Sequence, residues 1–219
     1  MADTAFALFD FDDSLSLGDS VLPYLLYCVR RGDAPWTQLP KALSGYLLWR
    51  LRPSAVARAK ESALSFIKGR SLQEMDELAR GFFREEQSKR FFQDGLKELW
   101  RLRAMGYHIL VVSASADCYM RVLPEFLPVD GVLATECAVD GEGRYTGRVG
   151  PNCKGEEKTR RIAAFLEDHG LRMDRVASRA YGDSASDAPM LLLTDAPVLV
   201  NPRKRLKARL PDASCVRWR

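Results

Sequence analysis

The stretch AFALFDFDDS, residues 5–14, joins a short apolar run to a group of acidic residues. The run over residues 5–9 is continuous rather than alternating, which is typical of a strand buried on both faces of a parallel sheet. Asp10 and Asp12 follow it directly, two positions apart. Two carboxylates this close repel each other unless a cation or a proton lies between them. The stretch therefore predicts a buried strand with a charged site at its end.

A second acidic group stands in GDSASD, residues 182–187, again after a strand-like run. Asp183 and Asp187 are four positions apart, so both can face the same way if a helix begins between them. Carboxylates gathered at two strand ends form a hard, oxygen-rich pocket, which suits Mg²⁺ rather than Zn²⁺. The candidate metal ligands are Asp10, Asp12, Asp183 and Asp187.

A phosphate group near these carboxylates would need positive charge and N–H donors. Ser113 follows the apolar run over residues 108–112 and offers a hydroxyl group and a backbone N–H. Lys154 stands in PNCKGEEK, residues 151–158, at an expected helix start where the helix dipole favours an anion. Lys158, on the same segment, is an alternative to Lys154.

The order of apolar runs indicates an α/β fold. Strands expected near residues 5–9, 108–112, 176–181 and 196–200 alternate with helical patterns, which predicts a parallel sheet with right-handed crossovers. An Asp-Gly turn over residues 140–143 predicts a hairpin. Residues 18–90 are mostly helical and interrupt the alternation once. We therefore expect a core of residues 1–17 and 91–219, with residues 18–90 inserted over the carboxyl edge of the sheet, where ligands bind.

Length and composition limit the class of protein. The chain has 219 residues, with 47% hydrophobic and 28% charged residues, which excludes a disordered, collagen-like or coiled-coil chain. The five cysteines are odd in number and form no CxxC pair, which favours a reduced, cytoplasmic protein. We expect no secretory signal, because no basic residue precedes the first apolar run and Asp10 interrupts that run early. We expect no membrane-spanning helix, because no uncharged apolar stretch reaches about 18 residues.

Positive charge is concentrated in two segments. Residues 21–70 hold nine Lys and Arg against two acidic residues, and residues 203–219 hold seven against one. The first segment also contains tyrosines, tryptophans and a nearly apolar run over residues 43–51. Such a basic and aromatic segment can contact an anionic membrane surface. Alternatively, its apolar faces pack internally and its arginine heads lie in solvent.

The motifs LFDFDDSLSLGDS, VVSAS, GPNCKGEEK and YGDSASDAPML resemble those of the haloacid dehalogenase (HAD) superfamily. They are most similar to its subfamily IB, the phosphoserine phosphatase-like branch, and are also similar to phosphatidylglycerophosphatase C-type proteins. The resemblance spans residues 5 to about 200. It implies a three-layer Rossmann-like parallel sheet with an inserted helical cap of the C1 type.

The resemblance also implies a Mg²⁺-dependent phosphatase that hydrolyses a phosphate monoester through an aspartyl-phosphate. Asp10 would be the nucleophile, and Asp12 would protonate the leaving oxygen and then activate water. Ser113, Ala114 and Lys154 would hold the phosphoryl group. Asp10, the backbone carbonyl of Asp12, Asp183 and Asp187 would form the magnesium site. The implied substrate is a small phosphorylated metabolite or a lipid phosphate head group, and no nucleic acid is expected.

Four residues depart from the family pattern, namely Asp13, Ser14, Asp19 and Ser186, and two of them bear on function. Asp13 occupies a position that is usually glycine, and Asp19 stands where phosphoserine phosphatases carry a glutamate, which puts phosphoserine itself in doubt. A dehalogenase would share the Asp10 nucleophile but would need neither Asp12 nor the metal cluster. Asp13 and the two basic segments also leave a further alternative, a lipid-surface or nucleic-acid binding protein with little catalysis.

Overall fold

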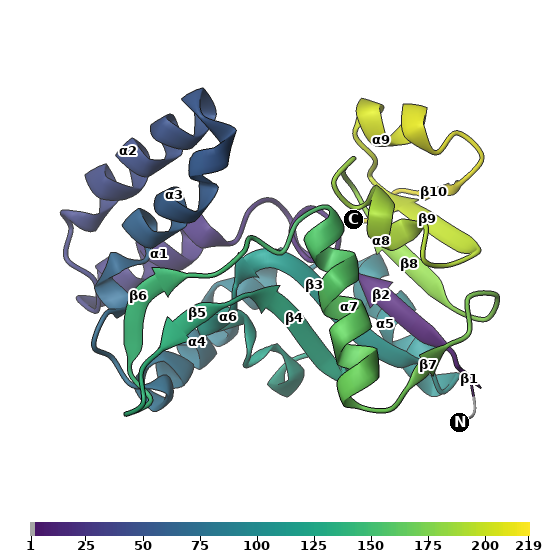
Figure 1. The fold of residues 1–219 in the computed structure, drawn as a ribbon, viewed down its shortest axis with the longest axis horizontal. Coiled ribbons are helices and arrows are strands. Elements are labelled where there is room, and N and C mark those ends of the chain that lie inside the picture. Colours follow the sequence, from purple (N-terminus) through teal and green to yellow (C-terminus); the bar gives the residue numbers. More distant parts are fainter. Residues whose placement is uncertain (1–2) are drawn as a thin grey trace.

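The structure, a computed structural model that describes residues 3–219, is built on a six-stranded sheet (Figure 1). The strand order is β10-β9-β8-β2-β3-β4, and every neighbouring pair is parallel. In chain order the strands are β2 (Phe6–Phe9), β3 (His108–Ala116), β4 (Gly131–Thr135), β8 (Arg179–Gly182), β9 (Ala196–Val200) and β10 (Ser214–Val216). The predicted parallel α/β architecture is confirmed.

Strand β2 lies in the interior of this sheet, between β3 and β8. Ala7 pairs with Ile109 on one side and with Arg179 on the other. All four residues of β2 are fully buried. A strand buried on both faces needs apolar side chains in both directions, which explains the uninterrupted apolar run that the sequence shows.

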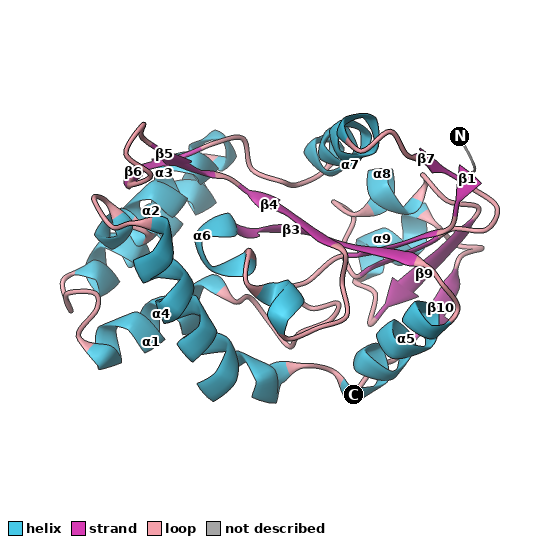
Figure 2. Ribbon diagram, turned by 90° about the horizontal axis from the view of Figure 1, so that it is seen from below, coloured by secondary structure: helices cyan, strands magenta, loops and turns pink. Residues whose placement is uncertain are grey.

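Helices cover both faces of the sheet, as Figure 2 shows. Helix α5 (Gln93–Ala104) packs Leu99 and Leu102 against Phe9 and Val111 on one face. On the other face α7 (Glu156–Asp168), α8 (Ala188–Leu191) and α9 (Lys204–Arg209) cover a second apolar cluster. That cluster contains Phe6, Leu8, Leu110 and Val112. Successive residues of each strand therefore supply opposite cores, and the structure has the expected three layers.

Four α-helices lie between β2 and α5 in the chain. They are α1 (Val21–Arg31), α2 (Gln38–Leu51), α3 (Val56–Ala63) and α4 (Leu72–Glu85). Gly32 ends α1 in the left-handed conformation, with φ of 80°, and its N–H bonds to the carbonyls of Cys28 and Val29. Ser71 and Glu74 form a capping box at the start of α4. The division into a cap of residues 18–90 and a core stays a prediction.

The predicted hairpin is present as β5 (Cys137–Val139) and β6 (Tyr145–Val149), which pair antiparallel. It contacts the segment before α4, because Tyr145 exchanges backbone hydrogen bonds with Gly69 and Arg70, at 2.8 and 2.9 Å. A helical turn, α6 (Asp117–Met120), follows β3. Two short strands, β1 (Asp3–Thr4) and β7 (Arg172–Met173), form a separate parallel pair.

Strand boundaries differ from the sequence prediction most clearly at β8 and β3. Strand β8 begins at Arg179 rather than at residue 176, because the Asp174 side chain accepts the N–H groups of Val176 and Ala177 in a turn. Strand β3 continues to Ala116, four residues beyond its expected end. In the part of the chain that the structure describes, none of the helices has both the length and the apolar character needed to cross a bilayer.

Candidate active site

Three buried aspartates meet at the carboxyl edge of the sheet. Asp10 follows β2, Asp183 follows β8, and Asp187 directly precedes α8. One carboxylate oxygen of each lies within 4.8 Å of the others. The first two meet because β2 and β8 are adjacent and parallel, so their ends share one edge. Gly182 allows the third to approach, since a Cβ at that position would lie 2.7 Å from the Cβ of Asp187.

A buried lysine joins two of these carboxylates. The Nζ of Lys158 lies 2.6 Å from Oδ1 of Asp10 and 2.8 Å from Oδ1 of Asp187. Lys154, the lysine that the sequence analysis preferred, is exposed. The structure therefore favours the alternative lysine at the carboxylates. Helix α7 begins at Glu156, after Lys154, so Lys158 lies on its first turn.

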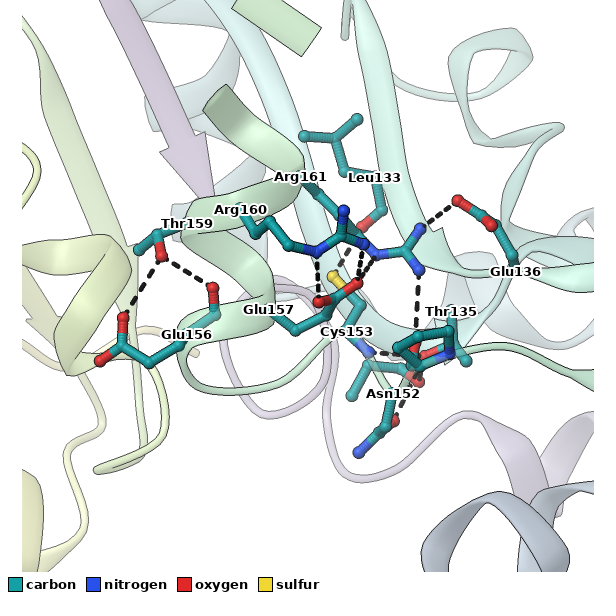
Figure 3. Close-up of polar contacts among 12 residues, drawn as sticks. Leu133, Thr135, Glu136, Asn152, Cys153, Glu156, Glu157, Thr159, Arg160 and Arg161 are labelled. Carbon is teal, nitrogen blue, oxygen red and sulfur yellow. Dashed lines mark hydrogen bonds and ion pairs between the residues drawn. The ribbon is translucent and has the colours of Figure 1, made fainter. Parts of the chain in front are cut away.

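A polar network fixes the start of α7, as Figure 3 shows. Thr135, at the end of β4, accepts the N–H of Cys153 at 3.1 Å. Arg161 pairs with Glu157 at 2.9 Å on its own helix and with Glu136 at 2.6 Å beyond β4. These contacts tie the segment before α7 and the second turn of α7 to the end of β4 and the residue that follows it. The orientation of α7, and with it the direction of Lys158, is set by this anchoring.

Asp12 occupies a separate position near β3. Its Oδ2 accepts the hydroxyl of Ser115 at 2.5 Å, and its Oδ1 accepts the N–H of Ser20 at 2.9 Å. The hydroxyls of Ser20 and Tyr119 lie 3.0 Å apart and continue this network. The Asp12 side chain is not part of the three-aspartate cluster. It is thus held beside that cluster by donors of its own.

The pKa values of these carboxyl groups differ with their surroundings. Burial, reinforced by the charge of Asp187, raises the pKa of Asp10 to about 6 even with Lys158 beside it. Burial also raises the pKa of Asp12 to about 7 and that of Asp183 to about 7. For Asp187, the Lys158 ammonium and the Ser184 donors outweigh burial, and the pKa is lowered. Asp12 can therefore carry a proton near neutral pH.

The other two predicted phosphate ligands lie in the C-terminal half of β3. Ser113 is buried, and its hydroxyl oxygen accepts the N–H of Ser115 at 3.0 Å. The carbonyl of Ala114 accepts the ammonium of Lys60, which comes from α3. Lys60 also donates to Thr135 at 3.0 Å and to Asn152 at 2.5 Å. Ser113 and Ala114 therefore share an edge with Asp10, and a helix of the insertion reaches the same edge.

Asp13 adopts a positive φ of 61°, a conformation that favours glycine. Its Oδ1 accepts the N–H of Gly18 at 2.8 Å, and its Oδ2 lies 2.7 Å from Nη2 of Arg203. The same guanidinium lies 2.9 Å from Oδ2 of Asp183. One arginine thus neutralises two carboxylates and compensates the charge that Asp13 brings to a glycine position.

Sequence reasoning missed Lys60, Ser115 and Arg203. Ser115 is visible as the second serine of VVSAS, two positions after Ser113 and so on the same face of a strand. Lys60 and Arg203 gave no local signal, because each stands in a basic segment that suits a solvated surface equally well.

The donor set fits a hard divalent cation. Its carboxylate oxygens are buried and close together, and the raised pKa values of Asp10 and Asp183 reflect burial together with mutual repulsion. Oδ2 of Asp183 is buried and accepts no hydrogen bond from residues 3–219, although Arg203 pairs with it electrostatically. Oxygen ligands of this kind are those that Mg²⁺ prefers in proteins.

Comparison with known proteins identifies the family. Residues 7–192 match the family model described as haloacid dehalogenase-like hydrolase. The chain is 29% identical over 211 residues to the phosphoserine phosphatase SerB1 of Mycobacterium tuberculosis, covering 94% of this chain and 67% of that one. It is also 29% identical over 194 residues to the protein CicA of Caulobacter vibrioides, covering 85% and 82%. The chain belongs to the haloacid dehalogenase-like hydrolase family.

Solved structures share the fold over nearly the whole chain. A Bordetella pertussis protein of unknown function superimposes with a TM-score of 0.84 at 24% identity, covering 98% of this chain and 99% of that one. A phosphoserine phosphatase described as a phospho-aspartyl intermediate analogue superimposes with a TM-score of 0.61 at 20% identity, covering 98% and 94%. The predicted HAD fold is confirmed, and the family together with its curated relatives supports an enzyme that hydrolyses phosphoric monoesters.

Proposed function

We propose that this protein is a Mg²⁺-dependent phosphatase that hydrolyses a small phosphate monoester through an aspartyl-phosphate on Asp10. The observation that carries the proposal is the meeting of Asp10, Asp183 and Asp187 within 4.8 Å, with Lys158 between two of them. A carboxylate nucleophile, a protonatable second carboxyl group and a buried ammonium together suit phosphoryl transfer.

The residues around Asp10 hold the phosphoryl group. Lys158 contributes a positive charge, and Ser113 contributes a hydroxyl and a backbone N–H from the C-terminal half of β3. The backbone of Asp10 is fixed by a hydrogen bond from its N–H to the carbonyl of Tyr181, at 2.9 Å. Ser14 donates to Oδ2 of Asp10 at 3.1 Å and thereby fixes the direction of the carboxylate. Such preorganisation stabilises charge that develops on the transferring oxygens.

The first chemical step transfers the phosphoryl group to the enzyme. A carboxylate oxygen of Asp10 forms a bond to phosphorus while the bond from phosphorus to the ester oxygen breaks. Asp12 gives its proton to that leaving oxygen, so an alcohol departs and Asp12 becomes ionised. The raised pKa of Asp12, about 7, supports this role because the acid must be protonated when the step begins.

The second step returns the enzyme to its starting state. Asp12, now a carboxylate, removes a proton from a water molecule whose oxygen attacks phosphorus. The bond from phosphorus to Asp10 breaks, inorganic phosphate leaves, and Asp12 is again protonated. Asp10, Asp183, Asp187 and the backbone carbonyl of Asp12 are the residues that would hold Mg²⁺. When bound, this ion supplies charge neutralisation that lets an anionic nucleophile approach an anionic phosphate.

Two experiments test the proposal. A panel of phosphate monoesters, phosphoserine included, is assayed with Mg²⁺ and with EDTA. We expect release of inorganic phosphate that stops in EDTA and returns when Mg²⁺ is added. Asp10→Asn should abolish turnover and the acid-stable labelling of the protein by a phosphorylated substrate, while Asp168→Asn, at the far end of α7, serves as the matched control. Turnover that persists in EDTA or in Asp10→Asn would refute the mechanism.

A further inference from the structure

Helix α2 carries an exposed apolar face. Leu43, Leu47 and Leu51 follow one another at intervals of four residues and are 58%, 53% and 82% exposed. Residues four apart lie on the same side of a helix, so these leucines form one stripe. We call this stripe, together with the exposed Tyr46 and Trp36 nearby in the chain, the α2 face. Burying these side chains away from water would be favourable.

The opposite side of α2 is the side that packs. Gln38 and Gly45 are its buried residues, and a Cβ at Gly45 would lie 3.1 Å from the backbone of Ala59 in α3. Gln38 donates to the carbonyl of Ala63 at 3.0 Å, which ties the start of α2 to the end of α3. Figure 1 shows α2 on the outer side of α3, at the end of the molecule remote from the N-terminus. The α2 face therefore points away from the rest of the described chain.

The charge around this face is of one sign. Residues 34–60 contain no acidic residue and five basic ones. Four of these are exposed: Lys41, Arg50, Arg52 and Arg58. Arg50 stands three positions after Leu47, on the same side of the helix. An occupant of this surface must therefore be apolar in its interior and negatively charged at its border.

These features select one occupant among the candidates. A second copy of this chain would bring the same arginines face to face, which like-charge repulsion opposes. A nucleic acid would match the arginines but would leave the leucine stripe in water, because its affinity comes mainly from phosphate contacts. An anionic lipid surface offers negative head groups above an apolar layer. Interfacial helices bind such surfaces through buried apolar area and basic residues together.

We propose that the α2 face docks this protein on the surface of anionic lipid membranes. The contact is peripheral, with the leucine stripe at the level of the acyl chains and Arg50 and Arg52 among the head groups. It concerns binding and does not depend on the proposed phosphatase reaction. Basic side chains are expected to bring the protein to the surface, and the leucines to retain it there.

Vesicle co-sedimentation of the full chain tests this proposal. The neutral vesicles contain phosphatidylcholine alone. The anionic vesicles contain about 30% phosphatidylglycerol, so that their surface carries about the negative charge of a natural membrane. We expect binding to the anionic vesicles and at least tenfold weaker binding to the neutral ones. The triple variant Leu43→Ser, Leu47→Ser, Leu51→Ser should bind the anionic vesicles at least tenfold more weakly. Arg50→Gln with Arg52→Gln should reduce both the affinity and its dependence on salt.

The matched control changes exposed apolar residues elsewhere. Met105→Ser with Val176→Ser alters two such side chains outside α2 and should leave vesicle binding unchanged. Circular dichroism and thermal unfolding of each variant establish that it is folded. Absence of binding to anionic vesicles at low salt would overturn the proposal.

The alternative occupants give distinct results. Equal binding by the triple serine variant would refute the proposal, because it would assign vesicle binding to another basic segment such as residues 203–209. Concentration-dependent self-association that only the triple variant abolishes, without vesicle binding, would assign the face to a second copy. Binding to duplex DNA that survives the leucine changes but not the arginine changes, again without vesicle binding, would assign it to nucleic acid.

Discussion

The guanidinium of Arg203 lies 2.7 Å from the carboxylate of Asp13, although 190 positions separate them in the chain. The same arginine lies 2.9 Å from Asp183 and so links the segment after β9 to two carboxylates of the site. An acidic side chain beside a phosphate-binding site is unfavourable unless its charge is balanced. The structure explains how this chain accommodates Asp13: its partner comes from the C-terminal basic segment.

If this pairing balances the charge of Asp13, a substitution of Asp13 should partly compensate the loss of Arg203. Arg203→Gln should raise KM for a phosphate ester roughly 3- to 10-fold, since the charge of Asp13 is then unopposed and a partly exposed pair contributes about 1 kcal/mol. Asp13→Asn keeps the oxygen that accepts the N–H of Gly18. In the Arg203→Gln background, Asp13→Asn should recover the part of the loss that comes from Asp13, whereas Asp183 still lacks its partner. Steady-state kinetics of the two single variants and the double variant measure the coupling, and strictly additive effects would contradict the compensation.

We expect substitutions of the two candidate lysines to have unequal effects on kcat/KM. Lys158→Met removes the ammonium between Asp10 and Asp187 and should lower kcat/KM roughly 100-fold or more. Lys154→Met changes an exposed side chain in the same segment and should alter kcat/KM less than about 3-fold. The Michaelis parameters of both variants, measured at saturating Mg²⁺, decide between them. A larger loss in Lys154→Met would show that the lysine in contact with Asp10 is not the functional one.

A substitution at Gly182 should perturb the candidate metal site without any change of charge. A Cβ there would lie 2.7 Å from the Cβ of Asp187, so Gly182→Ala must displace that carboxylate. We expect the variant to lose most of the thermal stabilisation that Mg²⁺ gives the protein. Gly141→Ala is the matched control, because nothing lies within 4 Å of its added methyl group. Differential scanning fluorimetry measures this stabilisation. Equal stabilisation by Mg²⁺ in both variants would argue against Asp187 as a ligand.

Lys60 predicts a dependence of stability on pH. Burial at the edge of the sheet lowers its pKa from 10.5 to about 8, although Asp19 and Asp12 act in the opposite direction. Between these two pKa values the unfolded chain holds the proton and the folded chain does not. Because the unfolded state then binds more protons, the contribution of Lys60 to the free energy of unfolding rises with pH over this interval.

The measurement compares the protein with Lys60→Met, whose side chain cannot titrate. The difference in free energy of unfolding, wild type minus variant, should increase by about 2 kcal/mol from pH 7.5 to pH 10.5. Denaturant titrations at four pH values in this range supply the difference, and other groups that titrate in both proteins cancel. A flat difference, or one that falls with pH, would show that the Lys60 ammonium is solvated in the folded protein.

Much of the site follows from the sequence because parallel strands share an edge. The apolar run before Asp10 is typical of a strand buried on both faces, and the run before Asp183 predicts a second strand. Strands that pair in parallel bring their carboxyl ends together. The proximity of these two aspartates could therefore be predicted without knowledge of side-chain geometry. The order of motifs, which resembles that of one superfamily, fixed the fold class in the same way.

The tertiary structure alone decided which cationic residues reach the site. Lys154 and Lys158 are four positions apart in a segment that begins a helix, and the residue at which α7 starts determines which of them faces Asp10. That start depends on the contact of Cys153 with Thr135 and of Arg161 with Glu136, and the local sequence does not encode either contact. Arg203 and Lys60 reach the site only through the packing of distant elements. Local patterns specify strands and their ends, whereas the direction of a long basic side chain depends on partners far away in the chain.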